Sequence, residues 1–171
     1  GINCRFDLVL EADRILLQGQ PASDALEAYR ALAMTLSSAE TLGATQAALD
    51  TTVDYTKQRV QFGQPLASFQ ALQHRMSNML IQTELTRSLI YAACNAADSG
   101  REDAARFARA AKVKATTVGR KVSQEAIQLH GGIATTDEYI VGHFFKRITA
   151  LESWVCSKGE ALKEFMALSP S

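Results

Sequence analysis

The sequence predicts an all-α domain built as an antiparallel four-helix bundle, with a short extended segment at its N-terminus. Proline and glycine are sparse, with 3 and 10 residues among 171, while alanine is abundant. Apolar residues recur every three or four positions through several long stretches, which is the period of an α-helix. The connections between these stretches are short, and helices joined in this way pack most simply as an up-and-down bundle.

The overall composition excludes several classes of protein. Lys plus Arg and Asp plus Glu both number 18, so the chain is formally neutral and has no charged block for nucleic acid or a membrane surface. Its three cysteines, Cys4, Cys94 and Cys156, lack CxxC spacing, so we expect neither a disulfide framework nor a metal site. No signal-like start and no apolar run of membrane-spanning length is present. We therefore expect a soluble, cytoplasmic protein with a single core.

The first twenty residues differ from the rest. Residues 6–10 alternate loosely between apolar and polar, and residues 15–19 form a second such segment that ends in glycine, so we predict one or two short strands or extended segments. A strand here would have unpaired edges unless it joined a sheet supplied elsewhere. We therefore interpret residues 1–20 as the tail of a preceding β-domain or a linker, and residues 21–171 as the C-terminal helical-bundle domain.

The first long helix should follow Pro21. Ser23 or Asp24 can cap it, with Glu27 placed to complete a capping box. Its apolar stripe continues to about Arg59, after which a glycine and a proline break the pattern. The small residues that should let a neighbouring helix come close are Ala39, Gly43, Ala44, Ala47 and Ala48.

Two further long helices follow. The second should begin near Ala67 or Ser68 and end at Asp98, and the third should run from about Glu102 to Leu129. The basic residues of the third helix are dispersed around its axis. Such dispersal is typical of a solvated surface rather than a nucleic-acid site.

Two shorter helices complete the pattern. Thr135 or Thr136 can cap a helix from about Asp137 to Phe145. A final helix should span residues 151–168.

Gly131 and Gly132 stop the third helix, and the pair admits two interpretations. Residues without Cβ commonly end helices, so the pair can be an ordinary helix C-cap. Alternatively, bare backbone N–H groups at the pair can approach a phosphate, with Gln128 one turn back offering its amide to the same ligand.

Two runs of residues carry a resemblance to a known family. The first signature is residues 55–66, which read YTKQRVQFGQPL, followed by FQALQH at 69–74. The second signature is QLHGG at 128–132, followed by TDEY at 136–139. Both are similar to runs in acyl-CoA dehydrogenases, and the spacing between them also matches. The resemblance covers residues 6–155, the part that in this family forms the C-terminal helical domain and the last strand entering it.

The resemblance implies a flavoprotein that removes two hydrogens, from Cα and Cβ of an acyl-CoA thioester. In this family FAD lies between a middle β-domain and the bundle, and its adenosine pyrophosphate reaches into a neighbouring subunit. An arginine fork suits a pyrophosphate, glycines allow backbone approach, and aromatic and glutamine side chains can flank an adenine or ribose. Without the resemblance, the simpler interpretations are a surface salt bridge for Arg59 and a core plug for Phe62. The positions that match the family's cofactor contacts are Arg59, Phe62, Leu66, Phe69, Gln70, Gln128, Gly131 and Gly132.

The resemblance also implies partners. These are an acyl-CoA substrate, an electron-transfer flavoprotein or similar acceptor, and further subunits of a homo- or hetero-oligomer, as a dimer or tetramer. The family uses N-terminal helical and middle β-domains to hold the flavin ring. We therefore expect this chain alone to bind no flavin and to show no activity.

The sequence departs from the family at the catalytic base, the carboxylate that takes the Cα proton. In most members a glutamate follows the glycine pair by some two dozen residues, but an ungapped count reaches Val155. Other members carry the base on the first long helix, where the count reaches Ala33. Glu152 is the best candidate, and it requires a deletion in the preceding loop. Its alternative interpretation is an exposed residue on the last helix.

Other polar residues on the first helix do not replace the base. Glu27 and Glu40 flank Ala33 at the wrong helical phase. An arginine that the family uses near CoA is also absent, because Met34 stands at its place, with Arg30 one turn away.

Three functions remain open. The protein can be a working dehydrogenase with an unusual base, or the non-catalytic subunit of a heteromeric dehydrogenase, as in bacterial members that handle bulky or dicarboxylic acyl-CoAs. Residues 144–147 and the stretch directly after them resemble those divergent subunits. The third is a plain helical interaction module. A metal-carboxylate bundle is excluded, because none of His74, His130 and His143 has a glutamate three residues before it.

Overall fold

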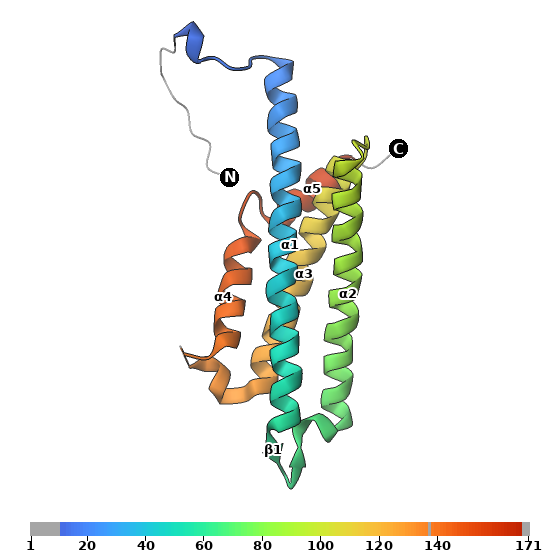
Figure 1. The fold of residues 1–171 in the computed structure, drawn as a ribbon, viewed down its shortest axis with the longest axis vertical. Coiled ribbons are helices and arrows are strands. Elements are labelled where there is room, and N and C mark those ends of the chain that lie inside the picture. The colour runs from blue at the N-terminus through green and yellow to red at the C-terminus, as the bar shows by residue number, and fades with distance from the viewer. Residues whose placement is uncertain (1–10, 137, 169–171) are drawn as a thin grey trace.

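Three long helices run side by side in alternating directions (Figure 1) in the computed structural model, which describes residues 11–136 and 138–168. They are α1 (Gln20–Gln58), α2 (Gln70–Asp98) and α3 (Ala104–His130). The shorter α4 (Ile140–Glu152) returns along α1 and α3, which confirms the predicted four-helix bundle, and α5 (Lys158–Ala167) packs on α3. None of the helices in the described residues is long and apolar enough to cross a membrane.

A hairpin and short 3₁₀ turns join the helices. The hairpin pairs β1 (Val60–Gln61) with β2 (Gln64–Pro65) in antiparallel register, with Val60 opposite Pro65. It closes the end of the bundle where α1 stops and α2 starts (Figure 1). The 3₁₀ turns are η1 (Ala12–Arg14), η2 (Leu66–Ser68) and η3 (Gly131–Thr135).

The central helix is α3, which packs against α1, α2, α4 and α5. It approaches α1 closely at Gly119, where an added Cβ would lie 2.8 Å from Thr41 Cγ2 and 3.1 Å from Thr45 Oγ1. The prediction that small residues of α1 would admit a neighbour was therefore wrong in part. Ala39 and Gly43 are exposed, and the space is provided by the glycine of α3 instead.

Serine and threonine hydroxyls line the buried face of α1. Thr41 Oγ1 donates to the Ser37 carbonyl at 2.8 Å, and Thr45 Oγ1 donates to the Thr41 carbonyl at 2.7 Å. Thr52 Oγ1 does the same to Ala48, at 2.6 Å. Because each of these hydroxyls is satisfied within its own helix, the core carries them without unpaired polar groups.

The start of α1 differs from the prediction. Gly19 is the N-cap, with φ 67°, and Pro21 lies in the first turn, so the helix begins before Ser23 and Asp24 and forms no capping box with Glu27. Residues 15–19 form no strand. The other predicted strand, at 6–10, lies outside the described residues.

The start of α4 also differs. The turn η3 carries the chain on to Thr135, so α4 begins at Ile140 rather than near Asp137, which lies outside the described residues. The hydroxyls of Thr135 and Thr136 do not cap α4, because they donate to the carbonyls of Gly132 and Ile133 within the turn.

The last predicted helix was placed too early. α4 continues to Glu152, so this residue ends α4 and does not lie on the last helix. A bend over residues 153–157 follows, and α5 starts only at Lys158. Ser157 and Glu160 form a reciprocal capping box there, which we did not predict from the sequence although its residue types were visible.

Candidate functional site

The first signature forms the end of α1, the hairpin and the start of α2. At the hairpin tip, Phe62 and Gly63 have φ values of 54° and 79°, the pair of positive values that a type I′ turn requires. Glycine adopts this conformation freely, whereas phenylalanine does so at a cost. Phe62 is 88% exposed, and its ring meets that of Phe69 edge to face, with 6.2 Å between the centroids. The Phe62 ring therefore projects into solvent at the tip of the hairpin and does not fill the core beneath the turn.

Arg59 lies at the C-cap of α1 and is exposed. Its carbonyl accepts a hydrogen bond from the N–H of Leu66 at 2.8 Å, which closes the base of the hairpin. Its guanidinium makes no hydrogen bond or ion pair with any described residue. The simpler interpretation, a surface salt bridge, does not hold for the described chain, so the cation is available to an anion from outside it.

The second signature forms the C-terminus of α3 and a corner. Gly131 has φ 67° and ψ −146°, a region open essentially to glycine alone. Its N–H donates to the Ile127 carbonyl, so Gly131 caps α3 and its amide is not bare as we expected. Gly132 differs, because its φ is not positive, so a residue with a Cβ would not be strained there. An added Cβ would meet nothing within 4 Å at either glycine. The protein itself therefore requires glycine at 131 but not at 132.

An aromatic cluster joins the two signatures. Tyr55, one turn before Arg59, stacks on His130 with ring centroids 4.3 Å apart, and its hydroxyl donates to the His130 carbonyl at 3.3 Å. The His130 ring also lies 5.2 Å from the ring of Tyr139. The hairpin and the glycine corner therefore meet at one end of the bundle, which we call the signature end (Figure 1).

His130 is a buried, neutral member of this cluster. Its Nδ1 lies 2.8 Å from the Ala126 carbonyl, which can only accept, so Nδ1 carries the proton and Nε2 is an acceptor. Nε2 is buried and has no hydrogen-bond partner among the described residues. Burial lowers the pKa of His130, and the bond to Ala126 opposes part of that effect. A charged imidazole would leave an unpaired N–H in the core, so the site favours the neutral ring.

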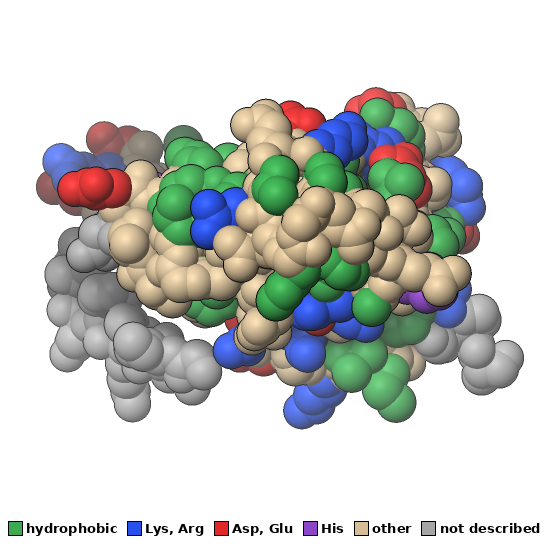
Figure 2. Space-filling view, turned by 90° about the horizontal axis from the view of Figure 1, so that it is seen from below, with side chains coloured by type: hydrophobic (Ala, Val, Ile, Leu, Met, Phe, Trp, Pro, Cys, Tyr) green, Lys and Arg blue, Asp and Glu red, His purple; other side chains and the backbone are tan. Residues whose placement is uncertain are grey.

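The surface of the signature end suits an anion better than a cation. Seen from this end (Figure 2), lysine and arginine side chains stand in several places among hydrophobic and uncharged ones, while acidic side chains lie mostly towards the margins. Gln128 and Gln70 are also exposed. In the described ranges no cluster of three His, Cys, Asp or Glu side chains is placed to hold a metal ion.

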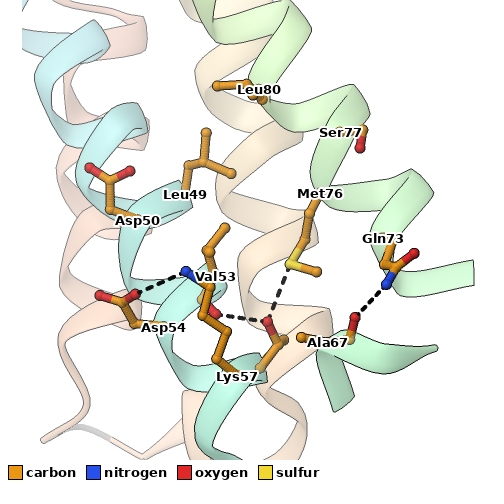
Figure 3. A pocket seen from close by; sticks show the side chains of 11 residues that line it. Leu49, Asp50, Val53, Asp54, Lys57, Ala67, Gln73, Met76, Ser77 and Leu80 are labelled. Carbon is orange, nitrogen blue, oxygen red and sulfur yellow. Dashed lines mark hydrogen bonds and ion pairs between the residues drawn. The ribbon is translucent and has the colours of Figure 1, made fainter. Parts of the chain in front are cut away.

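An open groove of about 560 Å³ adjoins the hairpin between α1 and α2 (Figure 3). Its floor is apolar, with Val53 of α1 facing Met76 of α2, and Asp54 and Lys57 stand at its rim 4.0 Å apart. Thr56 Oγ1 donates to the sulfur of Met76 at 3.3 Å beneath it. An apolar floor with a charged rim is typical of a contact surface for another chain.

The structure does not bring Glu152 together with the signatures. Glu152 is the last of the 13 residues of α4, so that helix carries it roughly 20 Å from the signature end. Its side chain is 26% exposed and pairs with Arg120, with 3.3 Å between Nη1 and Oε2. The candidate base and the candidate cofactor contacts thus lie in different parts of the chain.

The other positions considered for the chemistry offer no replacement. Val155 follows α4 with φ 70°, a rare value for a β-branched residue, and Ala33 is half-buried on α1. Met34 is fully buried, and Arg30 is engaged with Glu164 at 2.7 Å. The carboxylates that flank Ala33 are also paired, Glu27 with Arg109 and Glu40 with Arg147.

Two features of the structure were not predicted from the sequence. The aromatic cluster was missed, although Tyr55 and Tyr139 stand inside the quoted signatures. The buried cation Lys112 was also missed. Its signal was visible, because it lies among the alanines that form the buried stripe of α3.

Comparisons of this chain with a protein family, with related sequences and with solved structures all lead to the same family. A match to the family described as "Acyl-CoA dehydrogenase, C-terminal domain" covers residues 25–155. Acyl-CoA dehydrogenase IpdE2 of Mycobacterium tuberculosis is 39% identical over 131 residues, which is 77% of this chain and 39% of that protein. The solved structure of butyryl-CoA dehydrogenase from Megasphaera elsdenii has a TM-score of 0.76 and 31% identity, over 78% of this chain and 35% of its own. A structure described as the FAD complex of PigA has a TM-score of 0.70 and 28% identity, over 76% of this chain and 33% of its own.

The chain therefore spans little more than a third of the length of these proteins. The matched residues include both signatures and the greater part of the four bundle helices. The chain belongs to the acyl-CoA dehydrogenase family and carries the fold of its C-terminal helical domain.

Proposed function

We propose that this chain is the C-terminal part of a FAD-dependent enzyme that oxidises the Cα–Cβ bond of an acyl-CoA thioester. In this proposal the signature end holds part of the FAD, the α1–α2 groove contributes to an oligomer contact, and residues 1–20 belong to the tail of a preceding domain. The observation that carries the proposal is the meeting of three features at one end of the bundle: the exposed Arg59, which has no partner among the described residues, the projecting Phe62 and the glycine corner.

The residues of the signature end fit the two chemistries of a dinucleotide. A guanidinium presents paired N–H donors to pyrophosphate oxygens, and Arg59 has no competing partner in the described chain. At Gly132 the absence of a Cβ leaves room for a ligand to approach the backbone. The name of the PigA structure, an FAD complex, supports the same cofactor. The groups that we propose flank the adenine and ribose are Phe62, Leu66, Phe69, Gln70 and Gln128.

The proposed reaction needs a base from the protein. When bound, FAD supplies the acceptor for the hydride from Cβ. We propose that Glu152 takes the Cα proton, and that its ion pair with Arg120 must loosen for this transfer. The distance between Glu152 and the signature end does not argue against the proposal. If the adenosine pyrophosphate of one subunit reaches the signature end of another, as the family resemblance implies, the two sites serve different cofactor molecules.

A second candidate function rests on the missing carboxylates. Neither Val155 nor Ala33 can act as a base, and the position of the family's CoA arginine is taken by the buried Met34. These observations favour a non-catalytic subunit of a heteromeric dehydrogenase, in which a partner subunit supplies the base. A plain interaction module is not supported, because both signatures fall inside the family match.

The cofactor site can be tested by flavin retention in the full-length protein. Gly132→Ala should leave the fold intact, since nothing stands within 4 Å of the added Cβ, but should hinder the approach of the ligand to the backbone. Arg59→Gln should weaken FAD binding about tenfold or more, because a hydrogen bond to a charged group contributes about 1.5–3 kcal/mol. Arg101→Gln, an exposed arginine paired with Asp103, is the matched control. Equal flavin content in all variants would place FAD elsewhere.

The reaction can be tested by anaerobic bleaching of the flavin against a panel of acyl-CoAs. Glu152→Gln should retain flavin and lose bleaching by about a hundredfold or more, since a positioned base contributes at least that factor. Undiminished bleaching in Glu152→Gln would favour the heteromeric alternative, with the base on a partner subunit. The 171-residue chain alone should not bleach, because it holds only part of the proposed site. An electron-transfer flavoprotein or similar acceptor should then reoxidise the reduced enzyme.

A further inference from the structure

Lys112 is a cation buried in the middle of the bundle. It is 2% exposed, and its Nζ donates to the carbonyl of Leu151 at 2.7 Å and to that of Trp154 at 3.0 Å. No carboxylate in the described part of the chain forms an ion pair with it. Burial lowers the pKa of Lys112, and the nearby Cys156 and Glu152 oppose part of that effect. The ammonium thus sits at the C-terminus of α4, where the helix dipole favours a positive charge.

The two carbonyls that Lys112 holds bracket the end of α4. Between them the chain passes Glu152, the proposed base, and just beyond them stand Val155, with φ 70°, and the buried Cys156. A segment without regular hydrogen bonding takes its shape from such side-chain contacts. Lys112 makes two such contacts with this segment, through the carbonyls of Leu151 and Trp154.

Stability alone does not account for the charge. Burying an ammonium costs free energy that an apolar side chain of the same length would avoid. One of its acceptors, the Leu151 carbonyl, also receives the N–H of Trp154 at 3.2 Å, so it does not depend on Lys112 for a donor. The group for which Lys112 matters most is the Trp154 carbonyl, which lies in the bend itself.

We propose that Lys112 is a positioning residue, whose ammonium holds residues 151–156 in one conformation and thereby sets where the carboxylate of Glu152 lies. Only the last clause rests on the proposed function. The conformational part concerns this chain with no cofactor or substrate bound.

Trp154 reports on the conformational part directly. It is the only tryptophan in the 171 residues and is 55% exposed. Lys112→Met should shift its emission and raise its quenching by acrylamide while far-UV circular dichroism stays unchanged, and Lys112→Arg should restore part of the wild-type signal. Lys114→Met is the matched control, because Lys114 lies on the same helix and donates to Gln82 of α2 instead. Identical emission and quenching in wild type and Lys112→Met would overturn the proposal.

Hydrogen exchange still tests whether the bend is held if Lys112→Met does not fold. In the unmodified chain, the amide of Trp154 should exchange severalfold more slowly than that of Gly63 at the hairpin tip. Exchange at the same rate would show that the bend is not held, and would overturn the proposal.

The kinetic part uses the full-length protein. Lys112→Met should lower kcat severalfold with little change in KM, and Lys112→Arg should recover part of kcat. An unchanged kcat alongside a changed Trp154 signal would overturn the positioning of Glu152. If the wild-type enzyme has no dehydrogenase activity at all, the proposed function fails, and the fluorescence result still decides whether Lys112 holds the bend.

Discussion

The two ends of the bundle differ in whether their polar side chains have partners within the chain. At the signature end, Arg59, Phe62 and Gln128 are exposed, and the guanidinium has no partner in the described chain. At the far end, formed by the starts of α1 and α3 and by α5, Arg109 is buried and bonds to Glu27 at 2.6 Å and to Glu164 at 2.8 Å. One end is therefore arranged to be completed by something outside the chain, and the other to hold the chain together.

The far end is a closed network of charges. Arg30 donates to Glu164 at 2.7 Å and lies 3.8 Å from Glu27, so two arginines and two glutamates join α1, α3 and α5. Arg109 also donates to the Ala105 carbonyl at 2.9 Å. The buried guanidinium of Arg109 is thus satisfied by three acceptors, which is the condition under which a buried charge is tolerated.

Among the variants that test this difference between the two ends, Arg109→Met should lower the stability of the chain the most. The substitution removes a buried cation whose two carboxylate partners are 42% and 30% exposed. The expected loss is therefore about 1.5–3 kcal/mol, the range for hydrogen bonds to charged groups, and not the larger cost of breaking a fully buried pair. Urea denaturation of the chain measures the loss. Arg101→Met is the control, because its pair with Asp103 is exposed and should contribute less than about 1 kcal/mol. Similar losses in the two variants would mean that the far end is not held by its buried network.

A smaller effect should come from the middle of the bundle, at Gly119. A methyl group there meets Thr41, Thr45 and Ile148 at 2.8 to 3.2 Å, and overpacking of this kind costs about 1–3 kcal/mol. Replacing glycine by alanine within a helix stabilises the chain by about 1 kcal/mol, which offsets part of the overpacking cost. Gly119→Ala should therefore be destabilising by about 1 kcal/mol net. Gly43→Ala, which meets nothing within 4 Å on α1, should instead stabilise the chain by up to about 1 kcal/mol. Thermal unfolding of both variants should move the melting temperature in opposite directions.

The two ends also differ in how far they could be predicted. The two signatures could be picked out because they carry a family resemblance in two short runs, while their role as cofactor contacts stays a prediction. The bounds of α2 and α3 followed from apolar periodicity to within a few residues. The end of α4 and the start of α5 were misplaced, because the bend between them depends on Lys112, which comes from another helix. Periodicity does not reveal such a contact. The close approach at Gly119 was missed for the same reason, since it requires knowledge of which helix face meets which.

The identity of the base is the least predictable part of the candidate site. The family places a glutamate by its distance from the glycine pair, and that distance leads to Val155, which cannot accept a proton. The structure shows Glu152 near that position but paired with Arg120. The choice between a relocated base and a partner's base therefore depends on the assembled enzyme rather than on this chain.

The smallest expected effect is on the pH dependence of stability, to which the two ends should contribute in different pH ranges. Burial holds the pKa of His130 below its ordinary 6.5, so the unfolded chain binds this proton first, and the contribution of His130 to stability is present above pH 6.5 and lost as the pH falls through the folded value. For Glu164, burial raises the pKa, but Arg30 and Arg109 outweigh it and hold the pKa below 4.5, so the contribution of Glu164 is present above pH 4.5 and lost only in stronger acid.

Melting temperatures measured at a series of pH values should thus decline in two steps, with the signature end responsible for the first and the far end for the second. His130→Phe should remove the upper step and keep the lower one, because an aromatic ring between Tyr55 and Tyr139 is retained without a titrating group. Glu164→Gln should do the reverse. If His130→Phe leaves the decline below pH 6.5 unchanged, the neutral imidazole is not what couples the hairpin to the glycine corner. The Tyr55 hydrogen bond and the apolar packing around Leu129 and Val141 must then hold the signature end together.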